Sequence, residues 1–97
     1  MMYSFAKVAL EDLNEAGVYY GAQSEGLGTQ FLIEVGMALG RILEAPERRP
    51  EIEGRVRKYR MSRFSYGIFH KIAVGTAVEI VAVFDLRRRP GGWNERR

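Results

Sequence analysis

The sequence predicts an α+β fold in which an N-terminal antiparallel helical hairpin packs on a small antiparallel β-sheet. Three observations support this prediction. Apolar residues recur every three or four positions over about residues 6–45, as they do on one face of a helix. Over about residues 54–86 they alternate, which is the period of a strand. Pro46 and Pro50 separate the two regions, because proline ends a helix.

The first helix is expected over residues 6–24. Its apolar face is formed by residues spaced four, three and four apart: Ala9, Leu13, Ala16 and Tyr20. The opposite face is polar and carries Glu11, Asp12, Asn14 and Glu15. Gly21 and the glycine-rich run 24–28 should end this helix.

The second helix is expected over residues 29–44, with Thr29 as its N-cap. Its apolar stripe contains Phe31, Val35, Ala38, Leu39 and Ile42. Because the turn between the two helices is short, they should lie antiparallel.

Three strands, connected by two turns, are expected in the second half of the chain: residues 54–61, 64–72 and 77–84. On the last strand, one set of alternating residues should share a face: Val78, Ile80, Ala82 and Phe84. The residues between them are also mostly apolar, so both faces of this strand should be covered. Phe5 and its neighbours can supply a short additional strand.

The chain length of 97 residues predicts one domain, residues 1–97, with a basic tail at 87–97. So short a chain buries roughly two thirds of its unfolded surface, so a partner or self-association would stabilise it. The absence of cysteine excludes a disulfide framework and a thiolate site. We expect a cytoplasmic protein without a signal peptide or membrane contact, since the longest apolar stretch, 77–84, is far below the ~20 residues of a membrane span.

Charge is distributed unevenly along the chain. Residues 1–50 hold four basic and seven acidic residues, whereas residues 51–97 hold eleven basic and five acidic ones. The second half is therefore expected to face an anionic partner, which is nucleic acid, an acidic protein or both, although solvated surface charge is the plainer alternative.

The usual signatures of catalysis are absent. The sequence contains no phosphate-binding glycine loop, no histidine pair for a metal and no nucleophile elbow, so we expect no metal and no cofactor. His70 is interpreted as a strand histidine at the sheet edge, with a general base as the alternative. The carboxylates of Glu11, Asp12 and Glu15 are interpreted as a solvated helix face rather than a catalytic cluster.

The basic residues are the remaining candidates. On strand 54–61, Arg55, Arg57 and Tyr59 should share one face. Val56, Lys58 and Arg60 should share the other face. Cations on both faces favour a position near an open edge or cleft, where they either bind a ligand or keep the edge from aggregating.

A basic run, Arg87 to Arg89, follows the last strand directly and precedes Pro90. Trp93 comes next, after two glycines. Two roles for Trp93 remain open at this stage: anchoring the tail on the domain, or contacting a partner.

Several segments, in this order and spacing, resemble the RelE/ParE family of bacterial toxin–antitoxin (plasmid stabilisation) toxins. They are Phe5-x-x-x-Ala9-x-x-Asp12-Leu13-x-x-Ala16, Tyr19-Tyr20, Gly26-Leu27-Gly28-x-x-Phe31, Val56-Arg57, Arg63-Phe64-x-Tyr66-x-Ile68 and Ala82-Val83-Phe84-Asp85-x-Arg87-Arg88-x-Pro90-x-x-Trp93. Two positions depart from the family pattern: Asp85 stands where a histidine is common, and Ser65 where a proline is common.

The resemblance implies one of two activities. The RelE branch cleaves messenger RNA on the ribosome without a metal, and Lys58, Arg60 and Arg88 would serve by position. Gly67 stands where that branch has another arginine, however, and no tyrosine follows Arg88, so only three of five expected groups are present. The ParE branch is not catalytic and traps DNA gyrase on cleaved DNA. The glycine motif at 26–28 and the Arg-Arg-x-Pro-x-x-Trp ending resemble that branch more.

A ParE-like gyrase inhibitor without an active site is therefore the first hypothesis, a RelE-like nuclease the second, and a member that binds its antitoxin but is no longer toxic the third. The residues expected to contact the target are Arg57, Arg60, Arg63, Arg87, Arg88 and Trp93. The resemblance also implies an acidic, amphipathic antitoxin that wraps the helical hairpin and basic sheet and folds as it docks, with a homodimer or a hetero-oligomer possible. The residues expected to bind it are Phe31, Val35, Arg55, Arg57 and Tyr59.

Overall fold

The computed structural model describes residues 2–73, 77–88 and 91–95, and it confirms the predicted α+β fold. Five strands form one sheet in the order β1-β5-β4-β3-β2. Their bounds are Tyr3–Phe5 (β1), Glu51–Glu53 (β2), Val56–Arg60 (β3), Tyr66–Ile72 (β4) and Val78–Asp85 (β5). The sheet is mixed rather than wholly antiparallel, because the N-terminal strand β1 pairs parallel to β5.

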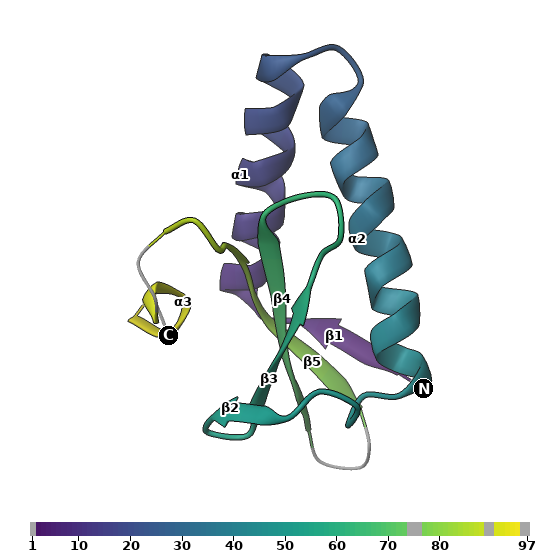
Figure 1. The fold of residues 1–97 in the computed structure, drawn as a ribbon, viewed down its shortest axis with the longest axis vertical. Coiled ribbons are helices and arrows are strands. Elements are labelled where there is room, and N and C mark those ends of the chain that lie inside the picture. Colours follow the sequence, from purple (N-terminus) through teal and green to yellow (C-terminus); the bar gives the residue numbers. More distant parts are fainter. Residues whose placement is uncertain (1, 74–76, 89–90, 96–97) are drawn as a thin grey trace.

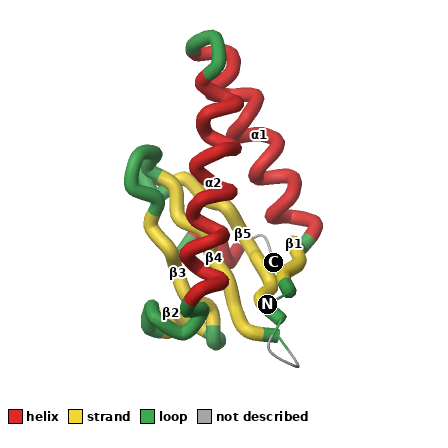
Figure 2. Tube along the Cα trace, turned by 90° about the vertical axis from the view of Figure 1, so that its right-hand side faces the viewer, coloured by secondary structure: helices red, strands yellow, loops and turns green. Residues whose placement is uncertain are grey.

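The helical hairpin covers one face of the sheet, and its turn rises beyond the strands. In Figure 1, α2 lies to the right of the sheet and the short helix α3 (Gly92–Glu95) to the left. Figure 2, seen from the right, shows α2 in front of the strands. No helix among the described residues is both long and apolar enough to cross a lipid bilayer.

The two long helices are α1 (Lys7–Gln23) and α2 (Leu27–Glu44). The predicted N-cap at Thr29 is wrong, because α2 begins two residues earlier and Gly26 is its N-cap. Gly26 has a φ of 80°, a left-handed conformation that glycine adopts without steric cost, so the chain reverses within three residues.

Just after this turn the helices are in close contact through glycine. A Cβ atom at Gly28 would lie 2.5 Å from the backbone oxygen of Gly17 and 3.1 Å from the nitrogen of Gly21. Aromatic rings then fill the space between hairpin and sheet: Tyr20, Phe31, Phe64 and Tyr66, with ring centroids 4.8 to 5.9 Å apart. These rings form the centre of the larger core.

Strand β2 is not predicted by the sequence pattern. Gly54 and Arg55 both have positive φ, 54° and 68°, and they form the turn of a β2–β3 hairpin. Paired left-handed residues suit the twist of a tight hairpin. The prediction that Arg55 shares a strand face with Arg57 and Tyr59 is therefore wrong, since Arg55 lies on the turn.

Strand β5 contains an irregularity that changes which residues share a face. Phe69 pairs with Ala82 but the next residue, His70, pairs with Ile80, so Val81 is an extra residue. Such a bulge turns the following side chains to the opposite face. Ala82 and Phe84 were predicted to lie with Val78 and Ile80, and instead they pack on the far face of the sheet.

Two further expectations on polar residues are wrong. Asp12 is not part of a solvated cluster: it is buried, and its Oδ2 accepts a hydrogen bond of 3.0 Å from the Val83 N–H. Strand β1 pairs with the first part of β5, Val78 to Ile80, and does not extend as far as Val83. The Asp12 carboxylate therefore accepts a backbone hydrogen bond from the edge of β5 beyond the end of β1. His70 is buried on β4, the central strand, rather than at the sheet edge.

Candidate binding site

A cavity of about 370 Å³ lies on the face of the sheet opposite the helical hairpin. Lys58, Arg60 and Arg88, which the RelE resemblance singles out, all line it. The other lining residues are Ile52, Phe69, Phe84, Asp85, Leu86, Gly91 and Trp93. The structure thus brings together three cations that are up to 30 positions apart in the sequence.

Cross-strand pairing places the two cations of β3 on this face. Lys58 pairs with Phe69, and Arg60 pairs with Gly67, which in turn pairs with Phe84. Paired residues share a face, so both cations stand over the apolar cluster that includes Phe69 and Phe84. Gly67 has no side chain to fill the cavity. A Cβ atom at this position would lie 3.0 Å from the Leu86 side chain and 3.3 Å from the Lys58 side chain.

Arg88 reaches the cavity from the segment that follows β5. The Leu86 N–H donates a 2.7 Å hydrogen bond to the Ser65 carbonyl, which fixes this segment beside the β3–β4 loop. The Arg88 guanidinium lies 5.7 Å from the centroid of the Phe84 ring, within the range of a cation–π contact.

Helix α3 forms the remaining wall, and Trp93 holds it in place. The indole stacks on Phe69 with a centroid distance of 4.6 Å, and Trp93 is only 6% exposed. The Asn94 side chain also donates a hydrogen bond to the Glu53 carboxylate. Of the two roles left open for Trp93, the structure supports anchoring, and little of this predicted target contact is exposed.

The carboxylate of Asp85 lines the cavity but is already bound. Arg87 Nε lies 3.0 Å from Oδ1, and Arg87 Nη2 lies 2.8 Å from Oδ2. This two-point hydrogen bonding holds the pKa of Asp85 below its ordinary value. Within the described part of the chain, no ion pair joins Lys58, Arg60 or Arg88 to a carboxylate, so the cavity is cationic.

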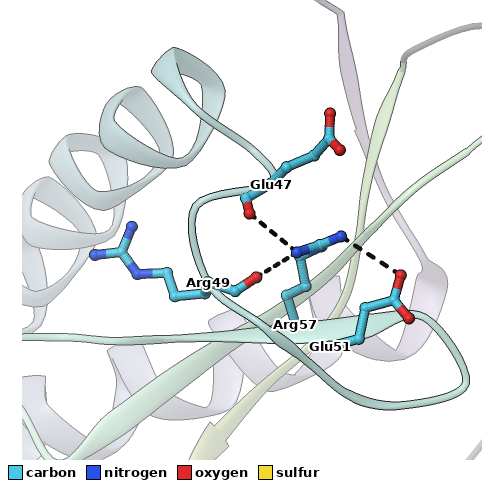
Figure 3. Close-up of polar contacts among 4 residues, drawn as sticks. All are labelled: Glu47, Arg49, Glu51 and Arg57. Carbon is cyan, nitrogen blue, oxygen red and sulfur yellow. Dashed lines mark hydrogen bonds and ion pairs between the residues drawn. The ribbon is translucent and has the colours of Figure 1, made fainter.

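Arg57, predicted to contact both target and antitoxin, lies outside this cavity and fastens the chain between α2 and β2 (Figure 3). Its Nη1 donates to the carbonyls of Glu47, at 3.0 Å, and Arg49. Its Nη2 lies 3.4 Å from Glu51 Oε2, and the side chain is 14% exposed. Arg57 therefore has a structural role in this fold.

The other predicted contact residues are distributed unevenly. Arg63 is exposed on the β3–β4 loop, and Arg87 is exposed although paired with Asp85. The predicted antitoxin contacts Phe31 and Val35 on α2 and Tyr59 on β3 are instead buried in the core between the helices and the sheet. The Tyr59 hydroxyl accepts a hydrogen bond from Arg41, and Arg49 lies 4.2 Å from the ring centroid.

A second hollow, which the sequence interpretation missed, runs along the helical hairpin. It has a volume of about 490 Å³ and is mostly apolar. Its lining residues are Leu10, Leu13, Asn14, Gly17, Val18, Gly21, Gly26, Gly28, Thr29 and Leu32. Leu10, Val18 and Leu32 are apolar residues outside the buried stripes, which was the available signal for an exposed apolar surface.

Burial of His70 predicts an acid-sensitive fold. Desolvation lowers the pKa of His70 below 6.5, and the nearby Arg57 and Arg49 add to the effect. The unfolded state then binds more protons than the folded state, so stability falls as pH drops below about 6.5, by at most ~1.4 kcal/mol per pH unit. Urea unfolding at pH 7.5, 6.5 and 5.5 should show this loss in the wild type. The variant His70→Gln should lack it, and an equal pH dependence in both proteins would contradict the assignment.

Residues 3–90 match the family described as ParE toxin of type II toxin–antitoxin system, parDE. No curated protein matches the sequence. A structure described as the chromosomal ParDE TA system from P. aeruginosa has a TM-score of 0.75 at 14% identity, covering 89% of this chain and 96% of that chain.

Two RelE structures are also similar in fold. The intact E. coli RelBE toxin–antitoxin complex gives a TM-score of 0.62 at 15% identity, covering 90% of this chain and 98% of that chain. The isolated E. coli RelE toxin gives 0.63 at 14% identity, covering 98% of this chain and 93% of that chain.

Proposed function

Because the chain belongs to the ParE toxin family of type II toxin–antitoxin systems, we propose that it inhibits DNA gyrase by binding and trapping cleaved DNA. A cognate antitoxin neutralises it. The observation that supports this proposal is the cavity of Lys58, Arg60 and Arg88, which is equipped to bind an anion but lacks a complete catalytic set.

A metal-independent nuclease needs groups that move protons as well as groups that hold phosphate. The lining of the cavity includes no histidine, and its carboxylate, Asp85, is bound by Arg87. An arginine at Gly67 would not fit without rearrangement, since even a Cβ atom would lie 3.0 Å from Leu86 and 3.2 Å from Phe69. These features favour binding over RelE-like cleavage of messenger RNA.

The antitoxin is proposed to contact two surfaces. Its apolar residues would fill the hollow on the helical hairpin, where Leu10, Val18 and Leu32 are about half exposed or more. Its acidic residues would approach the cationic cavity. The buried side chains of Phe31, Val35 and Tyr59 support these surfaces from beneath rather than contact the antitoxin.

The test is to incubate the purified protein with gyrase, ATP and supercoiled plasmid, denature the mixture and measure linear DNA. We expect linear DNA with the wild type and at least a tenfold reduction with Arg88→Glu, which reverses a charge in the cavity. Arg48→Glu is the matched control, because Arg48 is exposed on the α2–β2 connection and does not line the cavity.

A folded wild-type sample that produces no linear DNA would contradict gyrase inhibition. Cleavage of ribosome-bound messenger RNA that disappears with Lys58→Ala would then support the RelE-like alternative. Inactivity in both assays would identify a member of the family that is no longer toxic.

A further inference from the structure

Within the described residues, the three cations of the cavity differ from other cations near the sheet in forming no salt bridge. Arg57 is paired with Glu51, Lys71 with Glu79 at 3.6 Å, and Arg87 with Asp85. Across the described ranges, neither a hydrogen bond nor an ion pair ties the side chains of Lys58 and Arg60 to another group. Three cations that share one cavity outnumber its single carboxylate, Asp85, so an anion bound among them would be stabilised.

The position of the bound Asp85 adds to this effect. Its carboxylate lies in the lining, and Arg87 donates a hydrogen bond to each of its oxygens, while the charge of Arg88 acts on it without a salt bridge. Arg87 therefore acts as a positioning residue that holds the Asp85 carboxylate and offsets its charge, so that the lining keeps a net positive charge.

The shape and floor of the cavity suit a nucleotide unit better than a lone carboxylate. The cations stand beside an apolar floor of Phe69, Phe84 and Leu86, while Arg60 and Arg88 themselves are exposed and accessible to an anion. A volume of about 370 Å³ exceeds what one carboxylate group fills. A sugar-phosphate unit offers an anion for the cations and an apolar sugar face for the floor.

The geometry points to a phosphodiester site in this cavity, at which the protein holds the backbone of duplex DNA through Lys58, Arg60 and Arg88. This inference rests on the proposed gyrase inhibition and adds to it that the toxin contacts the DNA itself. Contacts to phosphate carry no sequence information, so binding is independent of base sequence and depends on salt.

The test measures fluorescence anisotropy of a labelled 20-base-pair DNA with the full chain, without gyrase, at several salt concentrations. We expect binding that weakens as salt rises. Arg60→Gln and Arg88→Gln should each weaken it about tenfold and reduce the salt slope by about one. The control Arg48→Gln should stay within about twofold of the wild type, because Arg48 is exposed outside the cavity. Circular dichroism melting of each variant checks that it is folded.

Competing occupants give different results. Poly-glutamate that binds while DNA does not would overturn the inference in favour of an acidic protein partner. Single-stranded RNA that binds more tightly than duplex DNA would overturn it in favour of RNA. Equal loss of DNA affinity in Arg48→Gln and Arg88→Gln would show that the affinity depends on net charge alone, and this result would also overturn the inference.

The DNA-binding and gyrase-trapping measurements together separate the phosphodiester site from gyrase inhibition. Gyrase trapping without any DNA binding by the isolated protein would leave the proposed function standing and remove the phosphodiester site. DNA binding that Arg88→Gln weakens, in a protein that does not trap gyrase, would support the site and remove the gyrase proposal.

Discussion

Replacement of Gly28 by alanine should lower the free energy of unfolding by about 3 kcal/mol. The new Cβ atom would lie 2.5 Å from the Gly17 backbone oxygen, which is too close for any rotamer change to relieve. The two helices would have to separate near their turn, and the aromatic rings packed below the turn would lose contact. Urea denaturation followed by circular dichroism measures this loss.

Gly36→Ala is the matched control for this prediction. Gly36 lies in the same helix, but among the described residues no atom outside its own neighbouring helical backbone is within 4 Å of its Cβ position. Alanine favours a helix over glycine by about 1 kcal/mol, so this variant should be slightly more stable than the wild type. Equal effects of the two substitutions would show that the helices are not in contact at Gly28.

Arg57→Ala should lower the free energy of unfolding by about 3 kcal/mol, because it removes several charge-assisted hydrogen bonds at once. The carbonyls of Glu47 and Arg49 and the carboxylate of Glu51 would lose their donor (Figure 3). Arg57→Lys should recover only part of the loss, since an ammonium group does not reproduce the planar fork of a guanidinium. Urea denaturation of the three proteins gives the values to compare.

Arg55→Ala is the control, since Arg55 lies exposed on the β2–β3 turn only two residues away. It should change stability by no more than about 0.5 kcal/mol. If Arg57→Ala proves as harmless as Arg55→Ala but weakens gyrase trapping or antitoxin binding, the binding role predicted from the sequence would replace the structural one.

The roles of the individual arginines could not be predicted from the sequence. The charge pattern indicates a basic second half but does not separate cations that hold the fold from cations that are free to bind. Arg57 and Arg60 lie on the same strand and look alike in the sequence. The backbone carbonyls that bind Arg57 belong to residues eight and ten positions earlier, and a carbonyl has no sequence signature.

The role of Trp93 and the orientation of the side chains along β5 also depend on residues that are distant in the sequence. Whether Trp93 anchors the tail depends on Phe69, a residue 24 positions earlier that offers its ring on the far face of the sheet. The alternation along β5 is regular in the sequence, yet the bulge at Val81 moves Ala82 and Phe84 to the opposite face. Register is decided by pairing with β4, so no pattern within β5 itself reveals it.

The sequence by itself determined the helical hairpin, the three main strands and the toxin family, because helix period, strand period, turn residues and ordered motifs are local properties of the chain. Only the tertiary structure decided that Lys58, Arg60 and Arg88 share one cavity, that Arg87 binds Asp85 beside it, and that Phe31, Val35 and Tyr59 lie in the core. These contacts join segments that are distant in the sequence. They form only when the helical hairpin packs on one face of the sheet and α3 packs on the other.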